Sequence, residues 1–418
     1  MQEKELKKVG PVKIYATDIT FRSYLFFWIG QLISLLGSSI VQFALIWWIT
    51  VETESAIILS IASVLTFLPQ VITIPIAGVF ADKWNRKTTL IVIDFSQAIV
   101  TFILALIFLR GWGTVWIVII FNCLRSLFQA FHMPTVDAIV PTMIPKDKLT
   151  RINSVNNLFT GLIRFMGPII GASLMVFWSI KEILWIDVIS FIIALIPLSV
   201  ISIPTIEKDQ DKQEKTSFII EFNEGLQLLK TTPGFLILTL WSLLANFLLI
   251  PFTTLLPYYV KVTHLGTESH LAILLAFMQA GSISGAILIS LKKVWKRKVL
   301  IIMAGGALTS TGFLIAALAP TGLFLMIAIG EFIIGFTLAI GLPLYFTILQ
   351  TAVPPDKQGR IFSIDATISF AIMPIGMIIA GPLANFMGIV NFFVLFAILG
   401  IILNLTVYSF TNIRNVLK

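Results

Sequence analysis

The chain has 418 residues, of which 57% are hydrophobic and only 12% are charged. Soluble globular domains carry about 25% charged residues, so this composition excludes a chain that covers its whole surface with water-exposed polar groups. A single cysteine, Cys123, excludes a disulfide within the chain and leaves the redox compartment open.

The start of the chain is polar over residues 1–18, and the first apolar stretch after it is long enough to span a membrane. This arrangement shows no cleavable signal peptide. We therefore expect the N-terminus to remain in the cytosol, with the first span acting as its own signal.

Apolar runs of spanning length recur along the whole sequence. A helix needs about 20 apolar residues to cross about 30 Å of hydrocarbon. Twelve such runs are expected, at 24–50, 56–80, 88–109, 114–136, 153–177, 183–203, 234–260, 270–291, 299–318, 322–347, 362–386 and 389–411. The sequence therefore predicts an all-α membrane protein with twelve transmembrane helices, and the even number places both termini on one side.

Basic residues are distributed unevenly between the expected loops. With the N-terminus inside, 24 of the 29 Lys and Arg fall in cytosolic segments, and the outside loops hold only Arg110, Lys181 and Lys261. Cytosolic loops of membrane proteins collect Lys and Arg. The net charge of +8 thus indicates topology and not a nucleic-acid partner. We expect a multi-pass protein of the plasma membrane with both termini cytosolic.

A polar stretch at residues 204–233 divides the chain near its middle. It begins as a charged linker and continues with Phe218, Phe222, Leu226 and Leu229 at helical spacing. This spacing predicts an amphipathic helix on the cytosolic membrane surface. The expected domains are a bundle over 1–203, the linker over 204–233 and a second bundle over 234–418.

The two halves of the chain contain a repeat. Residues 145–154 read PKDKLTRINS and residues 354–363 read PPDKQGRIFS, with six identical positions at an offset of 209, half the chain length. Gly167 falls on Gly376 at the same offset. A duplicated unit of six spans predicts two six-helix bundles. Parallel repeats of this kind are the plan of the major facilitator superfamily of secondary transporters.

The stretch AGVFADKWNRKTTL at residues 77–90 concentrates four charges in six positions between two apolar runs. It resembles the loop 2–3 signature of that superfamily, in which a glycine, an acid and basic residues surround a tight turn, and the matching positions are Gly78, Asp82, Lys83, Arg86 and Lys87. The resemblance implies that Asp82 contacts a helix start in the other half and stabilises the outward-facing state. It also implies that Arg86 contacts an acid at the end of span 4, where Asp137 lies. An ordinary basic hairpin loop is the alternative, but it does not account for Gly78 or Asp82.

Residues 161–172, GLIRFMGPIIGA, resemble the Gly-Pro-rich antiporter motif of the superfamily, with Gly167, Pro168 and Gly171 at matching positions. The resemblance implies an exporter in which small residues let span 5 pack closely on span 8. Ordinary packing of a kinked membrane helix is the alternative.

Polar stripes run along several spans, most clearly around Arg125, whose neighbours at helical spacing are Asn122, Gln129 and His132. An ionisable side chain at mid-bilayer costs about 2.5–3.5 kcal/mol or more and is a functional candidate. The resemblance implies that spans 1, 4, 7 and 10 line a central cavity. The expected cavity residues are Gln31, Gln42, Asn122, Arg125, Gln129, Arg164, Asn246 and Tyr345.

The acids expected at membrane depth are Glu331 in span 10, Asp187 a turn or so inside span 6, and Asp94 and Asp365 near cytosolic ends. A proton carrier needs a buried acid that gains and releases a proton near neutral pH. Glu331 is therefore the first candidate and Asp187 the second. We expect Arg125 to be the cationic counterpart of Glu331 or a substrate anchor. Alternatively, either acid only neutralises Arg125 or Arg164 within its bundle.

The sequence contains no metal-ligand spacing, nucleophile–base pair or nucleotide-binding loop, so neither an enzyme, a cofactor nor direct use of ATP is expected. The whole chain is similar to the drug-exporter branch typified by bacterial macrolide-efflux proteins. That similarity rests on WIGQLISLLGSSIVQFALIWW in span 1, RSLFQAFHMPTVDAIVP in span 4 and EGLQLL before span 7.

The predicted function is proton-coupled export of amphipathic drugs, macrolide antibiotics first, by alternating access. The expected partners are the drug, protons and the lipid bilayer, and the chain is expected to work as a monomer. The alternatives are a siderophore or lysolipid exporter of the same fold, or a transporter-derived membrane sensor that does not transport.

Overall fold

A computed structural model describes residues 17–204, 234–292, 294–353 and 358–415. Twelve helices within these ranges are long and apolar enough to cross a membrane, which confirms the predicted all-α membrane fold. The amphipathic helix predicted in the linker lies outside the described residues.

The first six helices are α1 (Asp18–Thr53), α2 (Ala56–Lys83), α3 (Arg86–Leu109), α4 (Val115–Met143), α5 (Lys146–Met175) and α6 (Ile180–Val200). The second six are α8 (Phe235–Tyr258), α9 (Glu268–Leu291), α10 (Lys298–Ala317), α11 (Phe324–Ala352), α12 (Gln358–Met387) and α13 (Ile389–Phe410). A π-helical turn, η1 (Tyr259–Thr263), extends α8, and a short 3-10 helix, η3 (Asn412–Asn415), follows α13.

Polar side chains between the apolar runs cap the first turns of several helices. The Ser55 hydroxyl accepts a hydrogen bond from the backbone N–H of Ile58 at the start of α2, over 3.3 Å. The Asn85 amide oxygen accepts one from the backbone N–H of Thr88 at the start of α3, over 3.1 Å. Such caps satisfy donors that have no partner within the helix, so these polar residues determine where the helices begin.

Several helices extend beyond the apolar runs that predicted them, most clearly at two turns. α4 continues to Met143 instead of 136, and α5 begins at Lys146 instead of 153, so that two residues separate them. Likewise α11 reaches Ala352 and α12 begins at Gln358. Hydropathy marks where an apolar run ends, whereas the helix continues with polar residues past that point. Pro145 suits the start of α5 because the first N–H groups of a helix have no partner within it.

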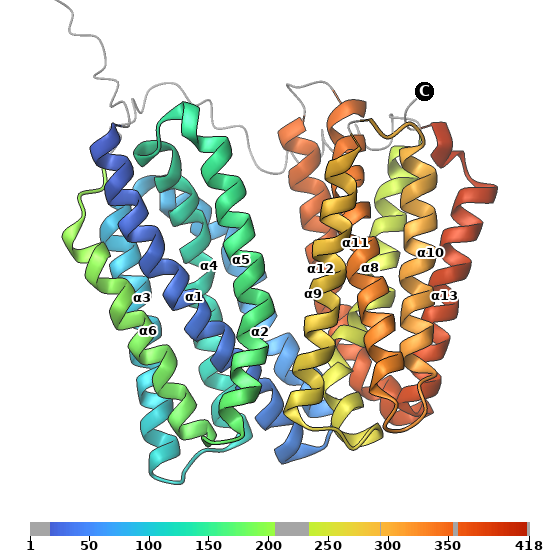
Figure 1. The fold of residues 1–418 in the computed structure, drawn as a ribbon, viewed down its shortest axis with the longest axis horizontal. Coiled ribbons are helices and arrows are strands. Elements are labelled where there is room, and N and C mark those ends of the chain that lie inside the picture. Colours follow the sequence, from blue (N-terminus) through green and yellow to red (C-terminus); the bar gives the residue numbers. More distant parts are fainter. Residues whose placement is uncertain (1–16, 205–233, 293, 354–357, 416–418) are drawn as a thin grey trace, which may run out of the picture.

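The helix pairings of the first bundle recur in the second. α1 packs on α5 and α6 as α8 packs on α12 and α13, and α2 packs on α4 as α9 packs on α11. Gly167 of α5 faces Ser39 of α1, and its repeat partner in α12, Gly376, faces Ile250 of α8. The helices α1–α6 and α8–α13 therefore form two bundles on one plan, as the repeat predicted (Figure 1).

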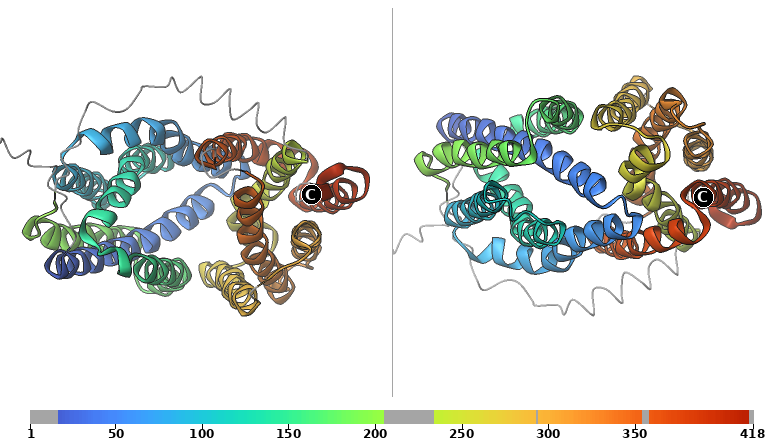
Figure 2. Two further views of the ribbon diagram at one scale, coloured as in Figure 1. Left: turned by 90° about the horizontal axis from the view of Figure 1, so that it is seen from above. Right: turned by 90° about the horizontal axis from the view of Figure 1, so that it is seen from below.

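The two bundles stand side by side, with α1 beginning and α13 ending at the same end of the molecule (Figures 1 and 2). We call this the terminal end and the opposite one the distal end. At the distal end a single hydrophobic core contains residues of both bundles, including Leu45, Leu59, Phe252 and Ala380. At the terminal end the described residues form a separate core in each bundle. The bundles are thus joined through their distal ends.

The junction between the bundles includes a close approach of α2 and α12. A Cβ atom added at Gly381 of α12 would lie 2.6 Å from Cα of Ile57 and 2.7 Å from the carbonyl oxygen of Ala56, at the start of α2. A glycine permits this backbone contact because it has no side chain to separate the two helices. α5 also packs on α9 across the junction.

Candidate functional site

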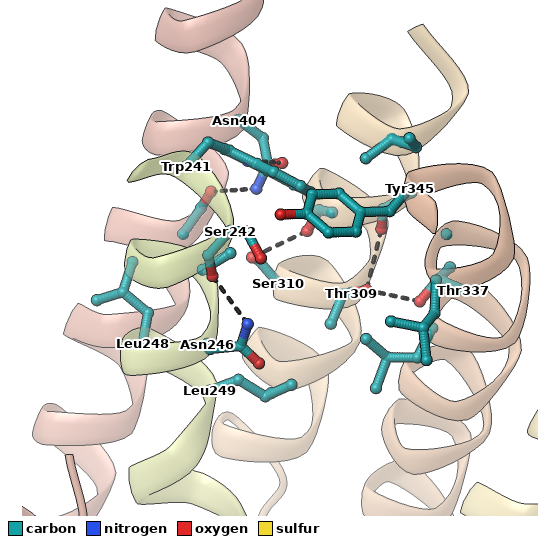
Figure 3. Close-up of a pocket in the computed structure, with 18 of the residues that line it drawn as sticks. Trp241, Ser242, Asn246, Leu248, Leu249, Thr309, Ser310, Thr337, Tyr345 and Asn404 are labelled. Atoms are coloured by element: carbon teal, nitrogen blue, oxygen red, sulfur yellow. Dashed lines mark hydrogen bonds between the residues drawn. The ribbon is translucent and has the colours of Figure 1, made fainter. Parts of the chain in front are cut away.

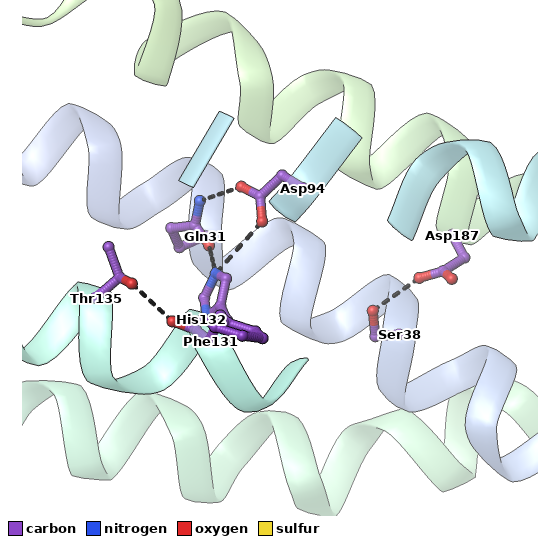
Figure 4. A network of polar contacts seen from close by, with 7 residues as sticks. All are labelled: Gln31, Ser38, Asp94, Phe131, His132, Thr135 and Asp187. Atoms are coloured by element: carbon purple, nitrogen blue, oxygen red, sulfur yellow. Dashed lines mark hydrogen bonds and ion pairs between the residues drawn. The ribbon is translucent and has the colours of Figure 1, made fainter. Parts of the chain in front are cut away.

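A buried ion pair joins four helices of the first bundle. Nη2 of Arg125 on α4 lies 2.7 Å from Oδ2 of Asp187 on α6, and the Asp187 side chain is fully buried. The hydroxyl of Ser38 on α1 donates to Oδ1 over 2.8 Å, as Figure 4 shows, and that of Thr101 on α3 donates to Oδ2 over 3.0 Å. The carboxylate that pairs with Arg125 is therefore that of Asp187, in the same bundle. Glu331, the expected counterpart, is not this partner.

A second polar network lies nearby in the same bundle (Figure 4). The Gln31 amide donates to Oδ2 of Asp94 over 3.0 Å, and Nε2 of His132 lies 2.9 Å from Oε1 of Gln31 and 3.5 Å from Oδ1 of Asp94. Asp94 is buried. Gln31, predicted to line a cavity, thus bridges an acid and a histidine. Asp94 had no predicted role, although the polar residues at these positions of spans 1, 3 and 4 were a usable signal.

A cavity of about 380 Å³ lies inside the second bundle, between α8, α10, α11, α12 and α13 (Figure 3). Two predicted cavity residues line it: Asn246, whose amide donates to the carbonyl oxygen of Ser242 over 2.8 Å, and Tyr345, whose hydroxyl donates to Asp365. Small-molecule sites are typically apolar cavities of about 300–1,000 Å³ with a few polar groups. This cavity therefore has the size and character of a ligand site.

Further polar groups of the cavity are paired with one another and were not identified from the sequence. The indole N–H of Trp241 donates to Oδ1 of Asn404 over 3.0 Å. The hydroxyls of Thr309 and Thr337 lie 2.6 Å apart. Whether these side chains face the cavity depends on how α8, α10, α11 and α13 are rotated about their axes. A single polar residue in an apolar run does not predict that rotation.

Glu331 lies on α11 and is buried, with 1% of its surface exposed. Its Oε1 atom has no hydrogen-bond partner among the described residues. Glu331 does not belong to the lining of the cavity in the second bundle. The structure thus places the first candidate for proton coupling inside the helix packing, on a helix that lines the cavity but outside the lining itself.

The remaining predicted cavity residues do not line the cavity of the second bundle. Asn122 and Gln129 on α4 are half-buried, whereas Gln42 on α1 and Arg164 on α5 are exposed. The structure therefore brings together Asn246 and Tyr345, and separately Arg125 and Asp187.

The loop 2–3 signature is described only in part, because the surroundings of Gly78 and the side chain of Asp82, both in α2, lie outside the described part of the structure. Nζ of Lys87 donates to the carbonyl oxygens of Ser199 over 2.8 Å and Ile201 over 2.6 Å. Lys87 thus holds the last carbonyls of α6, where a positive charge is favourable. The described side chains include no ion pair between Arg86 and Asp137.

The glycines of the antiporter motif face α1 and not α9, which is span 8. A Cβ atom at Gly167 would collide with the Ser39 side chain, and one at Gly171 would lie 3.2 Å from the carbonyl oxygen of Ile40. Pro168 lies between them inside α5. α5 does pack on α9, but the glycine row packs within the bundle. The expected use of these glycines at the contact of spans 5 and 8 was therefore wrong.

Comparison with known proteins agrees with this architecture. A family model described as the Major Facilitator Superfamily matches residues 27–376. Macrolide efflux protein A of Streptococcus pyogenes is 29% identical over 368 residues, covering 88% of this chain and 91% of that protein. Multidrug efflux pump Tap of Mycolicibacterium fortuitum is 25% identical over 360 residues, covering 84% and 87%.

Among solved structures, the nucleoside transporter NupG has the same fold. It matches with a TM-score of 0.75 at 13% sequence identity, covering 93% of this chain and 99% of that one. The twelve spanning helices, the two repeated bundles and the family match over most of the sequence lead to one conclusion: the chain belongs to the Major Facilitator Superfamily of transporters.

Proposed function

We propose that the chain exports amphipathic drugs, macrolide antibiotics first, across the plasma membrane in exchange for protons. The names of two relatives that match most of its length, a macrolide efflux protein and a multidrug efflux pump, support drugs as the substrate class. The antiporter motif at Gly167, Pro168 and Gly171 supports the outward direction.

The observation that carries this proposal is that, among the described residues, the hydrophobic core shared by both bundles lies at the distal end. The excess of Lys and Arg in the segments at the terminal end supports a cytosolic location for that end. With that orientation, the proposal treats the structure as an inward-facing state that receives substrate from the cytosol. Export requires the bundles to close at the terminal end and separate at the distal end, as in alternating access.

Glu331 is the proton carrier in this proposal. Burying an unpaired charge is costly, and one oxygen of this carboxyl has no hydrogen-bond partner in the described part of the chain. Asp187 is the second choice because Arg125, Ser38 and Thr101 already satisfy it. A neutral Glu331 fits the inward-facing packing, and loss of its proton favours a rearrangement that gives the carboxylate a partner.

Glu331→Gln tests this assignment, because glutamine keeps the size of the side chain and removes the ionisable group. We expect the variant to fold and to lose drug efflux driven by the proton gradient. The measurement is energy-dependent efflux of a macrolide from a pump-deficient bacterium, with and without a protonophore. Glu52→Gln, at an exposed position of α1, is the matched control and should export normally. Proton-driven efflux at the normal rate in Glu331→Gln would transfer the role to Asp187.

A further inference from the structure

The cavity inside the second bundle has an unbalanced charge. Asp365 of α12 is the only acid among the residues that line it, and none of those described residues is Lys, Arg or His. The Asp365 side chain is buried, and its polar partner in the described part of the chain is the neutral Tyr345 hydroxyl. A buried carboxylate without a cation is costly. The cavity is therefore electrostatically complementary to a positive charge.

The first bundle has no equivalent of this acid. At the repeat offset, the residue that corresponds to Asp365 is Asn156, which accepts a hydrogen bond from the indole N–H of Trp28 over 2.8 Å. Asp187 of the first bundle is paired with Arg125. Among the described residues, Asp365 thus has no cationic partner, unlike Asp187.

The rest of the cavity wall suits a large apolar body. Most lining residues are apolar, and Trp241, Tyr345 and Phe362 are among the aromatic ones. Figure 3 shows Tyr345 extending across the cavity toward Trp241. Aromatic faces attract cations within about 6 Å. At Gly341 a side chain would meet open space, so this part of the wall leaves room for a ligand.

We propose that this cavity binds an amphipathic organic cation, with its charged centre against Asp365 and its apolar body against the aromatic wall. Tyr345 is a positioning residue, because its hydroxyl donates to Oδ1 of Asp365 and leaves Oδ2 for the ligand. The site deepens the proposed drug export and rests on it for its role in the cell. It selects, among amphipathic drugs, those that carry a positive charge.

Two ions of the same shape and opposite charge test the site in the unmodified protein. Tetraphenylphosphonium and tetraphenylborate, each radiolabelled, are titrated separately against the purified full chain in nanodiscs, with empty nanodiscs as the background. We expect saturable binding of tetraphenylphosphonium with an affinity at least about tenfold above that of tetraphenylborate. Equal affinity for the two ions would overturn the proposal.

Variants locate the site at Asp365. Asp365→Asn keeps the shape and the acceptor for Tyr345 but removes the charge, so the affinity for tetraphenylphosphonium should fall at least about tenfold. Asp365→Glu keeps the charge and should stay within about threefold of the unmodified protein. Asp147→Asn, the same change at an exposed position of α5, should bind normally. Unchanged affinity in a folded Asp365→Asn variant would overturn the assignment, and the two-ion comparison remains decisive if that variant does not fold.

The site and the transport proposal fail in different ways. Selective cation binding at Asp365 without proton-driven efflux would contradict the proposed transport and leave the site intact. Proton-driven efflux with unchanged cation binding in Asp365→Asn would contradict the site and leave the proposed transport intact.

Discussion

Buried carboxylates of the two bundles differ in the number of polar partners that each one has. In the first bundle Asp187 pairs with Arg125 and accepts hydrogen bonds from two hydroxyls. In the second, Glu331 has an oxygen without a partner in the described part of the chain, and Asp365 has one neutral hydroxyl. Buried ions require such partners to replace lost hydration. Asp187 thus joins helices of the first bundle, whereas Glu331 and Asp365 have fewer polar partners among the described residues.

The Arg125–Asp187 pair predicts a stability effect that depends on both residues. Arg125→Met leaves Asp187 buried without its cation, which should cost about 3–5 kcal/mol and lower the midpoint of thermal unfolding in detergent. Adding Asp187→Asn removes the unpaired charge but keeps an acceptor for Ser38 and Thr101, so the double variant should recover much of the loss. Arg164→Met, at an exposed position of α5, is the control and should unfold like the unmodified protein. A double variant less stable than Arg125→Met would contradict the pairing.

The sequence identified these residues more reliably than it identified their contacts. Mid-span charge singled out Arg125, Asp187 and Glu331, and all three are mostly buried in the structure. Which acid faces Arg125 depends on the rotation of α4 against α6, which periodicity within one helix does not determine. For the same reason the contacts of Gln31 with Asp94 and His132 were not predicted.

Among the helices, the contact between α2 and α12 predicts control of the conformational equilibrium. Gly381→Ala places a Cβ atom 2.6 Å from the backbone of Ile57, and overpacking of this kind costs about 1–3 kcal/mol. Because the contact exists only while the distal ends are joined, the variant should favour the state in which they separate. Alanine itself is a better helix former than glycine, so α12 should remain intact.

The measurement for Gly381→Ala is a distance distribution between spin labels at the distal ends of the two bundles. Exposed Trp112 and Phe386 are suitable label positions once Cys123 is replaced by serine. The distribution should gain longer distances in Gly381→Ala. Gly161→Ala, where a side chain would meet open space, should leave it unchanged. An identical distribution in both variants would show that this contact does not control the equilibrium.

Helices were predicted well in number and poorly at some of their ends. Apolar length alone gave twelve spans because the hydrocarbon thickness fixes a minimum length. It ended span 4 at 136 and began span 5 at 153, whereas α4 and α5 fill most of that interval. Helices need no apolar residues beyond the membrane, so hydropathy does not mark their ends there. The direction in which the glycines of α5 face was missed because a motif does not specify its packing partner.

For the whole molecule, the repeat in the sequence predicted the arrangement of the bundles but not the conformational state. Two bundles on one plan follow from matching residues half a chain apart. The state follows from which ends share a core, and here it is the distal ends. Both states use the same buried residues within each bundle and differ at the junction, so a sequence pattern that reports burial does not distinguish them.

Transport of a macrolide by the purified chain in liposomes, with an imposed pH gradient and no nucleotide, tests the central claim most directly. Protein-free liposomes measure the passive uptake of a weak base, and a pH-sensitive dye in the lumen reports protons. We predict that acid-inside liposomes with the protein take up more drug than protein-free ones, release protons as they do so, and lose the excess when a protonophore collapses the gradient. Uptake equal to that of protein-free liposomes, or excess uptake that persists without the gradient, would contradict proton-coupled drug export.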